Sequence, residues 1–323
     1  MSKAFASCGN FNSPVNIPRG ITDVSYLFNY CNNFNSHVFI PNTVNNFYYM
    51  FFGCNNFNTL PTLEDGITTV SQLFMGCNKF NKQFIIPNTV TNTYRLFRDC
   101  RNFNSPVNIP NGVTDVRSMF EGCNNFNQPI EIPESVTDVG SLFNGCTNFN
   151  RPINVPNGVT AVSGMFANCN NFNQPIEIPE TVTSTSGMFS GCGKFNQQVA
   201  IPNSVTSMSN MYHNCFNLNC QQIIGSGVTS LSNTYANCNN LGGNIYIYSE
   251  NITNAYRMLY KHNNTKRINI FVPASTPAAM VNVLLNAQQY YSITGTAIGF
   301  SKNASNNCIG YNTYNNIYIY NNL

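Results

Sequence analysis

The regular spacing of the cysteines constrains the fold more than any other feature of the chain. Eleven cysteines recur at a constant step of 23 residues, without insertion or deletion. They are Cys8, Cys31, Cys54, Cys77, Cys100, Cys123, Cys146, Cys169, Cys192, Cys215 and Cys238. Self-similarity at a fixed period of about 20–50 residues is typical of repeat arrays, in which each unit buries its apolar face against its neighbours. We therefore predict that each unit forms one turn of a solenoid, giving about 11 turns.

Phenylalanine flanks the cysteine on both sides in most repeats. Three residues before the cysteine lie Phe5, Phe28, Phe51, Phe74, Phe97, Phe120, Phe143, Phe166 and Phe189, and later Tyr212 and Tyr235. Three residues after it lie Phe11, Phe34, Phe57, Phe80, Phe103, Phe126, Phe149, Phe172 and Phe195, and later Leu218 and Leu241. Equivalent positions of neighbouring turns lie beside one another, so these side chains are expected to form two ladders in the core.

The repeat around Cys123 shows the expected local structure. Apolar residues over 113–123 have helical or 3₁₀ spacing, which predicts a short helical turn with one face inward. Residues 126–133 alternate apolar and polar, which predicts a short strand that ends at Pro133, because proline has no N–H for a continuing ladder. The strands of successive turns are expected to form a parallel sheet.

An asparagine follows the second phenylalanine in nine repeats and follows Leu218 in a tenth. The column comprises Asn12, Asn35, Asn58, Asn81, Asn104, Asn127, Asn150, Asn173, Asn196 and Asn219. Stacked asparagines can hydrogen-bond from turn to turn. We interpret the column as structural, with a polar binding face as the alternative.

The outward position of each strand varies most along the chain. It is occupied by Asn16, Phe39, Thr62, Ile85, Asn108, Glu131, Asn154, Glu177 and Ala200. A ligand that contacts the sheet would be recognised by this row, so we take Asn108, Glu131, Asn154 and Glu177 as the candidate recognition face. The alternative is a merely solvated face. Two acids, Glu131 and Glu177, are two turns apart, which is wide for a catalytic carboxylate pair.

The cysteines and histidines predict no catalytic or metal site. A linear ladder of thiols does not converge on one point, as metal ligands must, so small buried thiols are expected. A disulfide between Cys215 and Cys220 stays open as an alternative. The three histidines are scattered, and acids such as Asp23, Asp115 and Asp138 are a feature of the repeat. We expect no enzyme activity, no cofactor and no metal.

Composition limits the partners. Charged residues make up 8% of the chain and the net charge is +3, without the basic stripe that nucleic-acid binding requires. No run of about 18 apolar residues predicts a membrane span, and the first residues lack the pattern of a secretory signal. The chain enters the repeat a few residues before Cys8 without a capping turn. That first turn is expected either to fray or to be covered by a partner protein.

Regularity decreases from about residue 216, and we divide the chain into a solenoid over 1–260 and a small α+β C-terminal cap or interaction domain over 261–323. Strands are predicted over 267–273, 291–298 and 316–320, and a helix over 275–285 with Ser275 as its N-cap. Beside the cap interpretation stands a contact patch, since tyrosine is enriched at interfaces. The candidate patch comprises Tyr290, Tyr291, Tyr311, Tyr314, Tyr318 and Tyr320.

Several phrases of the repeat resemble known families. FNQPI at 126–130 and 172–176, with VTxVxxMFxxC before the first copy, resembles the bacterial surface-protein repeat of Mycoplasma and Firmicutes. The IPxxVT phrase and the 23-residue step resemble BspA-like leucine-rich repeats, and the unit that begins INIFVP resembles the cap of such arrays. The chain has no tryptophan, whereas the first family has Trp-Asp after the strand. The resemblance implies a leucine-rich-repeat-like solenoid with a role in adhesion and recognition.

Two functional hypotheses follow. The first is a non-enzymatic recognition or structural module of a phage particle, made in the host cytoplasm and placed in a tail, baseplate or fibre. The alternative is a bacterial cell-surface adhesin. The expected partners are other virion or surface proteins, a host surface protein or glycan, or a second copy of the chain, and not nucleic acid or a membrane interior.

Overall fold

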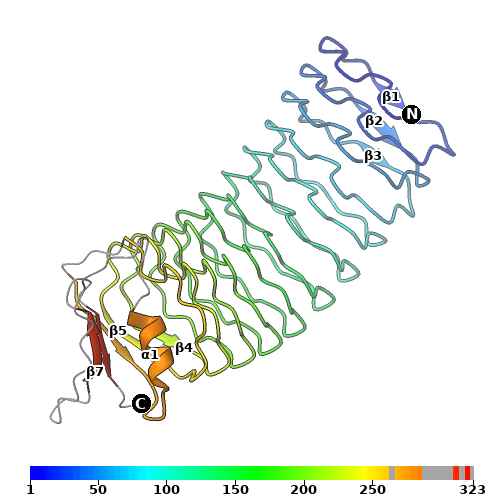
Figure 1. The fold of residues 1–323 in the computed structure, drawn as a ribbon. Helices are drawn as coiled ribbons and strands as arrows, with labels where there is room; N and C mark the ends of the chain where they lie inside the picture. The colour runs from blue at the N-terminus through cyan, green and yellow to red at the C-terminus, as the bar shows by residue number, and fades with distance from the viewer. Residues whose placement is uncertain (262–265, 286–307, 313–316, 321–323) are drawn as a thin grey trace. The chain divides into compact units, whose positions relative to one another are not determined.

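The computed structural model describes residues 1–261, 266–285, 308–312 and 317–320. For residues 308–312 and 317 it describes the backbone alone. The chain divides into two units, Met1–Val159 and Thr160–Leu323. Each unit contains successive 23-residue turns stacked in parallel (Figure 1). The predicted repeat solenoid is thereby confirmed. The predicted boundary at 260/261 falls inside the second unit and stays a prediction.

Phenylalanine ladders form the core, as predicted. In the first unit Phe120 stacks on Phe126 of the same turn with ring centroids 4.2 Å apart, and on Phe97 and Phe143 of the adjacent turns at 5.8 Å. In the second unit Phe189 stacks on Tyr212 at 5.7 Å. These rings are essentially inaccessible to water. Offset stacking of buried rings adds to the stabilisation that their area alone gives.

The segment before each cysteine is not helical, so the predicted helical turn is wrong. Its N–H groups alternate between a carbonyl three residues back, as from Cys123 to Phe120 at 3.0 Å, and a carbonyl of the next turn, as from Gly122 to Asn144 at 2.7 Å. Ser118 and Gly122 have positive φ values of 54° and 74°, the conformation required at the third residue of a type II turn. A series of β-turns takes the place of the predicted helix. The residues that were predicted to face inward are nevertheless buried.

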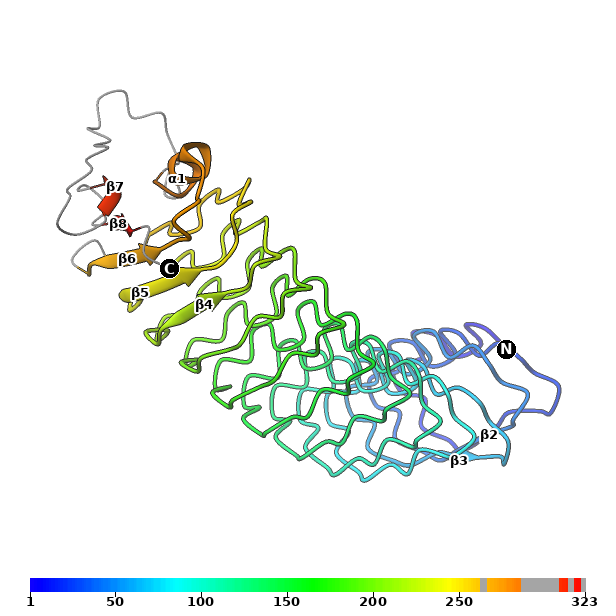
Figure 2. The same cartoon turned by 90° about the horizontal axis from the view of Figure 1, so that it is seen from below.

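The parallel sheet is shorter than predicted. In the first unit β1 (Val15–Asn16), β2 (Val38–Ile40) and β3 (Thr62–Leu63) pair in parallel and in order. The stretch 64–221 contains no assigned strand. In the second unit β4 (Gln222–Ile224) and β5 (Gly243–Ile247) pair in parallel, followed by β6 (Ile268–Phe271) (Figure 2).

Prolines account for this interruption. Glu64 donates its N–H to the carbonyl of Ile40 in the preceding turn at 2.9 Å. In most central repeats the position of Glu64 is a proline, and a second proline often lies four residues earlier, as at Pro106 and Pro110. Both positions would direct their N–H groups toward the preceding turn, so the prolines remove two ladder donors. The turn of β5 has Asn244 and Tyr248 at these two positions, and Tyr248 donates its N–H to the carbonyl of Ile224 in the preceding turn at 3.0 Å.

The C-terminal elements complete the sheet of the second unit. Its order is β4-β5-β6-β8-β7, where β8 (Ile317–Tyr320) is parallel to β6 and β7 (Cys308–Asn312) is antiparallel to β8. The predicted strands over 267–273 and 316–320 are confirmed with small shifts of their ends, and β7 was not predicted. The strand predicted over 291–298 lies outside the described residues.

The predicted helix is present as α1 (Ala278–Leu285). It begins directly after Pro277, whose missing N–H is unneeded at a helix start, and it buries Met280, Val281, Leu284 and Leu285. Ser275 is not its N-cap: the Ser275 hydroxyl donates to the Glu250 carboxylate instead. Among the described residues, none of the helices could span a lipid bilayer.

Candidate functional site

The predicted recognition face is exposed. In the first unit Asn108, Glu131 and Asn154 lie at equivalent outward positions of three consecutive turns, between buried residues such as Val107 and Ile109. Glu177 holds the same position in the second unit and is also exposed. The alternation of exposed and buried residues follows from the extended backbone. The structure thus makes these four side chains accessible, and their role as a recognition face stays a prediction.

The asparagine column is structural in the way predicted. From Asn12 to Asn127, and again at Asn173 and Asn196, the Oδ1 atom accepts the backbone N–H of the next asparagine along the column, at 2.7–3.0 Å. One such bond joins the Asn150 N–H to Asn127 Oδ1 at 3.0 Å. These side chains satisfy backbone donors that have no strand partner. Their amides are committed to the fold, which argues against the alternative of a binding face.

The thiols of the ladder are free, and all but that of Cys8 in the first turn, which is exposed, are buried. Cys31, Cys54, Cys77, Cys100, Cys123, Cys146, Cys169, Cys192, Cys215 and Cys238 are all inaccessible. Sγ atoms of the ladder donate to phenylalanine or tyrosine carbonyls at 2.9–3.6 Å, as from Cys123 to Phe97 at 2.9 Å. Burial raises the pKa of Cys123 well above its usual value, so its thiolate is disfavoured. Cys215 and Cys220 are both unbridged.

The aspartates of the repeat accept local backbone hydrogen bonds within its β-turns. Asp23, Asp115 and Asp138 each accept the backbone N–H two residues on, at 2.8, 3.1 and 2.7 Å, a local bond typical of aspartate in turns. The bonds from Ser25 lower the pKa of Asp23. Burial lowers the pKa of His213. No group of three His, Cys, Asp or Glu side chains among the described residues is placed to hold a metal ion.

The predicted tyrosine patch is described only in part. Tyr290, Tyr291 and Tyr314 lie outside the described residues, and Tyr311 lies on β7, where the structure describes backbone alone. Tyr318 and Tyr320 on β8 are half-buried. Arg267 lies 3.9 Å from the Tyr318 ring centroid and donates to the Tyr320 hydroxyl, and Tyr320 stacks on Phe271 at 5.2 Å. Both tyrosines contribute to packing within the cap.

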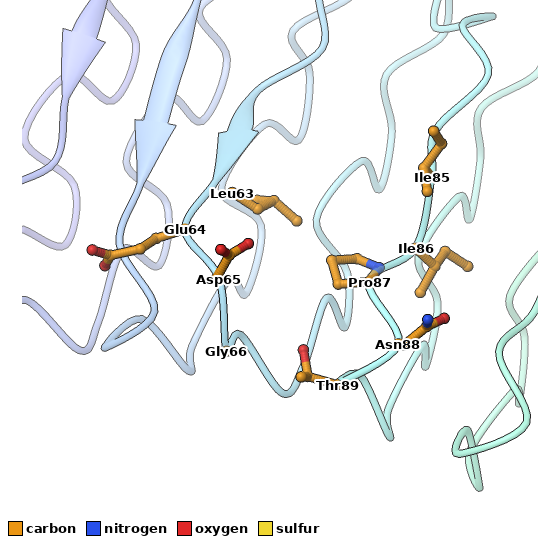
Figure 3. Close-up of a pocket in the computed structure, with 9 residues that line it drawn as sticks. All are labelled: Leu63, Glu64, Asp65, Gly66, Ile85, Ile86, Pro87, Asn88 and Thr89. Carbon is orange, nitrogen blue, oxygen red and sulfur yellow. The ribbon is translucent and has the colours of Figure 1, made fainter.

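A shallow pocket of about 410 Å³ lies between β3 and the fourth turn (Figure 3). Leu63, Ile85 and Ile86 supply its apolar walls, and Ile85 is 82% exposed. The pocket follows from Pro61, which occupies the position of Val15, the residue that donates to the next turn at 3.0 Å. Proline has no such donor. The ring centroids of the adjacent Phe57–Phe80 pair are 6.4 Å apart, against 5.8 Å for the preceding Phe34–Phe57 pair.

Carboxylates line one edge of this pocket. Glu64 points toward the turn of β2 and away from Ile85 (Figure 3), where it accepts the Asn42 N–H at 3.0 Å and pairs with Arg19 at 2.6 Å. Asp65 is exposed. The pocket therefore offers an apolar contact beside the carboxylate of Asp65, and its lining residues include no cysteine, serine or histidine.

A second surface was missed by the sequence analysis, and we call it the aromatic patch. It comprises Tyr26, Tyr30, Tyr48, Tyr49 and Phe52 of the second and third turns. Tyr49 contacts Tyr26, Tyr48 and Phe52 with centroids 5.5, 4.2 and 4.7 Å apart, and Phe52 contacts Tyr30 at 5.8 Å. Tyr30 is 54% and Tyr48 37% exposed. Large aromatic side chains exposed side by side are unusual unless a surface contacts something.

Three of these tyrosines have an unfavourable backbone conformation. Tyr26, Tyr30 and Tyr49 have φ values of 56°, 58° and 53°. A bulky residue in this region is disfavoured, at a cost of order 1–3 kcal/mol each. The equivalent positions in the central turns are mostly glycine, serine or asparagine, as at Gly122 and Ser118. The signal in the sequence was therefore a tyrosine where other repeats have small residues.

The family model described as "Mycoplasma protein of unknown function, DUF285" matches residues 1–84, 63–132, 133–219 and 201–290. A search of curated proteins gives no match. Among solved structures, a leucine-rich repeat protein from Bacteroides ovatus is 18% identical with a TM-score of 0.45, and the match covers 80% of this chain and 63% of that chain.

A leucine rich cell surface protein from Faecalibacterium prausnitzii is 19% identical with a TM-score of 0.48, covering 76% of this chain and 82% of that one. The leucine-rich repeat protein of T. pallidum is 21% identical with a TM-score of 0.40, covering 66% and 95%. The chain thus spans less than two thirds of the Bacteroides protein. Since the family model matches most of its length, the chain belongs to the family described as Mycoplasma protein of unknown function, DUF285.

Proposed function

We propose that the protein is a non-catalytic recognition module that binds a partner through the outward surface of its turns. One observation carries this proposal. Each turn has nearly the same interior, whereas the outward strand position changes from Asn108 to Glu131 to Asn154 in consecutive exposed turns. A surface that varies while the interior is constant is suited to specific contact, because its residues can change without cost to the core.

The setting of this module is proposed in two forms that share the same surface chemistry. The first is a phage particle, in which the chain contacts other virion proteins or the host surface. The second is the bacterial cell surface, where the chain acts as an adhesin. Antibodies to the chain distinguish the two: the first form predicts the protein in purified virions, and the second predicts labelling of intact cells. Detection in the soluble lysate alone contradicts both.

Binding to the predicted face is tested with a triple variant, Asn108→Ala, Glu131→Ala and Asn154→Ala. The labelled full chain is applied to host cells or purified particles, and bound protein is quantified. We expect at least tenfold weaker binding for the triple variant. A matched control replaces the exposed residues Asn111 and Glu134, which lie in the bends directly after the prolines of their turns. Equal binding by all three proteins contradicts the assignment of the face.

A further inference from the structure

We propose that the aromatic patch of the second and third turns is a binding site for a neutral polysaccharide. The proposal rests on the proposed recognition function and assigns to it a second site and a class of ligand. Its five residues, Tyr26, Tyr30, Tyr48, Tyr49 and Phe52, contact one another as a continuous aromatic surface within the first unit.

The rings of the patch are held in place by the fold. A Cβ atom on Gly53 would lie 2.7 Å from the Tyr30 ring, and one on Gly76 would lie 2.8 Å from the Phe52 ring. Each ring therefore lies directly against the backbone of the next turn, where glycine leaves room for it. A ring fixed in this way loses little freedom when a ligand stacks on it.

The backbone conformation argues that folding alone does not select these tyrosines. Tyr26, Tyr30 and Tyr49 take left-handed φ values at positions where most other turns have glycine, serine or asparagine, with Gln72 and Arg95 as further large residues in this region. Asn168 replaces Tyr30 and Ser118 replaces Tyr49 in equivalent turns. Strained residues that the fold does not need are typical of functional sites.

The chemistry of the patch favours a neutral ligand that carries both C–H faces and hydroxyl groups. None of its five residues is charged. Four tyrosines elsewhere in the described chain carry arginines on their faces, as Arg95 lies over Tyr94 at 4.6 Å. The other three are Tyr256, Tyr260 and Tyr318. In the patch, Lys3 over Tyr26 at 5.4 Å is the one such contact that the described residues show.

Sugar rings match this surface. The electron-rich face of an aromatic ring attracts the polarised C–H bonds of a pyranose, and tyrosine hydroxyls exchange hydrogen bonds with sugar hydroxyls. Asn45 and Asn46 are exposed and lie shortly before Tyr48 in the chain. Carboxamides of this kind both donate and accept, as sugar hydroxyls do. Aromatic walls with a few polar groups are the usual composition of a small-molecule site.

The test uses the full chain with cellohexaose, mannohexaose and N-acetylchitohexaose as probes. Saturation-transfer NMR and calorimetry measure binding. We expect at least one of these hexasaccharides to bind the wild type. The double variant Tyr30→Asn and Tyr49→Ser installs the residues of equivalent turns and should weaken binding at least tenfold without lowering Tm. The control Tyr248→Ser changes a 50% exposed tyrosine outside the patch and should bind as the wild type does.

Two outcomes overturn the proposal. One is that none of the three hexasaccharides binds the wild type at millimolar concentration. The other is that the double variant binds as tightly as the wild type. If the double variant loses binding to protease-sensitive material on cells while no hexasaccharide binds, the patch is a protein contact and the polysaccharide assignment is wrong. If the double variant still binds cells or particles, the recognition function stands without this site.

Discussion

Individual side chains have two kinds of role in this chain. Asparagines, aspartates and cysteines that look like candidates for chemistry bind backbone groups instead, as the Asn127, Asp115 and Cys123 bonds show. The residues free to contact a partner are those that the repeat does not use. Substitutions at these polar repeat positions are therefore expected to lower stability and to leave partner binding unchanged.

Removing one rung of the asparagine column tests this role. Asn127→Ala deprives the Asn150 N–H of its acceptor at 3.0 Å. We expect the free energy of unfolding to fall by about 0.5–1.5 kcal/mol. Asn127→Asp keeps an oxygen acceptor and should lose less than Asn127→Ala. Chemical denaturation of the three proteins checks this, and equal losses for both variants would show that the acceptor is not what stabilises the turn.

The buried thiols predict a pH dependence of stability. Burial raises the pKa of Cys238 to about 12, and raises those of Cys123 and Cys146 well above their usual value. An unfolded thiol loses its proton near its ordinary pKa of about 8.5, whereas the folded one keeps it. Above that pH the folded state binds more protons, so stability falls as pH rises toward the folded pKa.

We therefore expect Tm to be constant below about pH 8 and to fall between about pH 8.5 and 9.5, before tyrosine titrates. The measurement is a series of thermal unfolding curves under reducing conditions. A Cys100→Ala variant should show a shallower fall, since one titrating group is lost. A Tm that stays constant over the same range would mean that the thiols titrate in the folded state as they do in the unfolded chain, and a Tm that rises would mean that they are ionised in the folded state.

At the scale of elements, the sequence predicted which residues of a solenoid turn face inward better than it predicted the hydrogen bonds that join one turn to the next. The alternation over 126–133 correctly placed Ile130 and Ile132 inside. The continuous sheet was overestimated, because the prolines at 129 and 133 lack donors that a ladder requires. The helical turn was wrong because apolar spacing does not report the sign of φ, although the glycines and asparagines before each cysteine carried that signal. The aromatic patch was missed because apolar spacing does not show which tyrosines take a positive φ.

The pocket beside β3 leads to a prediction about the backbone hydrogen bonds of that strand. Pro61→Val restores the N–H that Val15 uses to reach the next turn at 3.0 Å. A new hydrogen bond contributes about 0.5–1.5 kcal/mol, which the lost rigidity of proline offsets by about 0.4–1 kcal/mol. Stability should change little, but the new backbone amide at position 61 should be protected from hydrogen exchange as NMR measures it. Exchange at the rate of an exposed amide would show that Pro61 does not cause the pocket.

Each turn of the array is stabilised mainly by the turns directly before and after it. Within the first unit, Phe126 contacts Phe120 in its own turn and Phe103 and Phe149 in the adjacent turns. Such nearest-neighbour coupling is what allows an outward residue to change without consequence for distant turns. The proposed recognition function depends on this independence of interior and surface.

Hydrogen exchange in a Phe126→Ala variant tests this claim most directly. The substitution leaves a cavity and should cost about 3–5 kcal/mol. We expect that amide protection, measured by mass spectrometry across the first unit, falls most around residue 126 and in the adjacent turns, and recovers toward β1. A uniform loss of protection from Met1 to Val159 would contradict it.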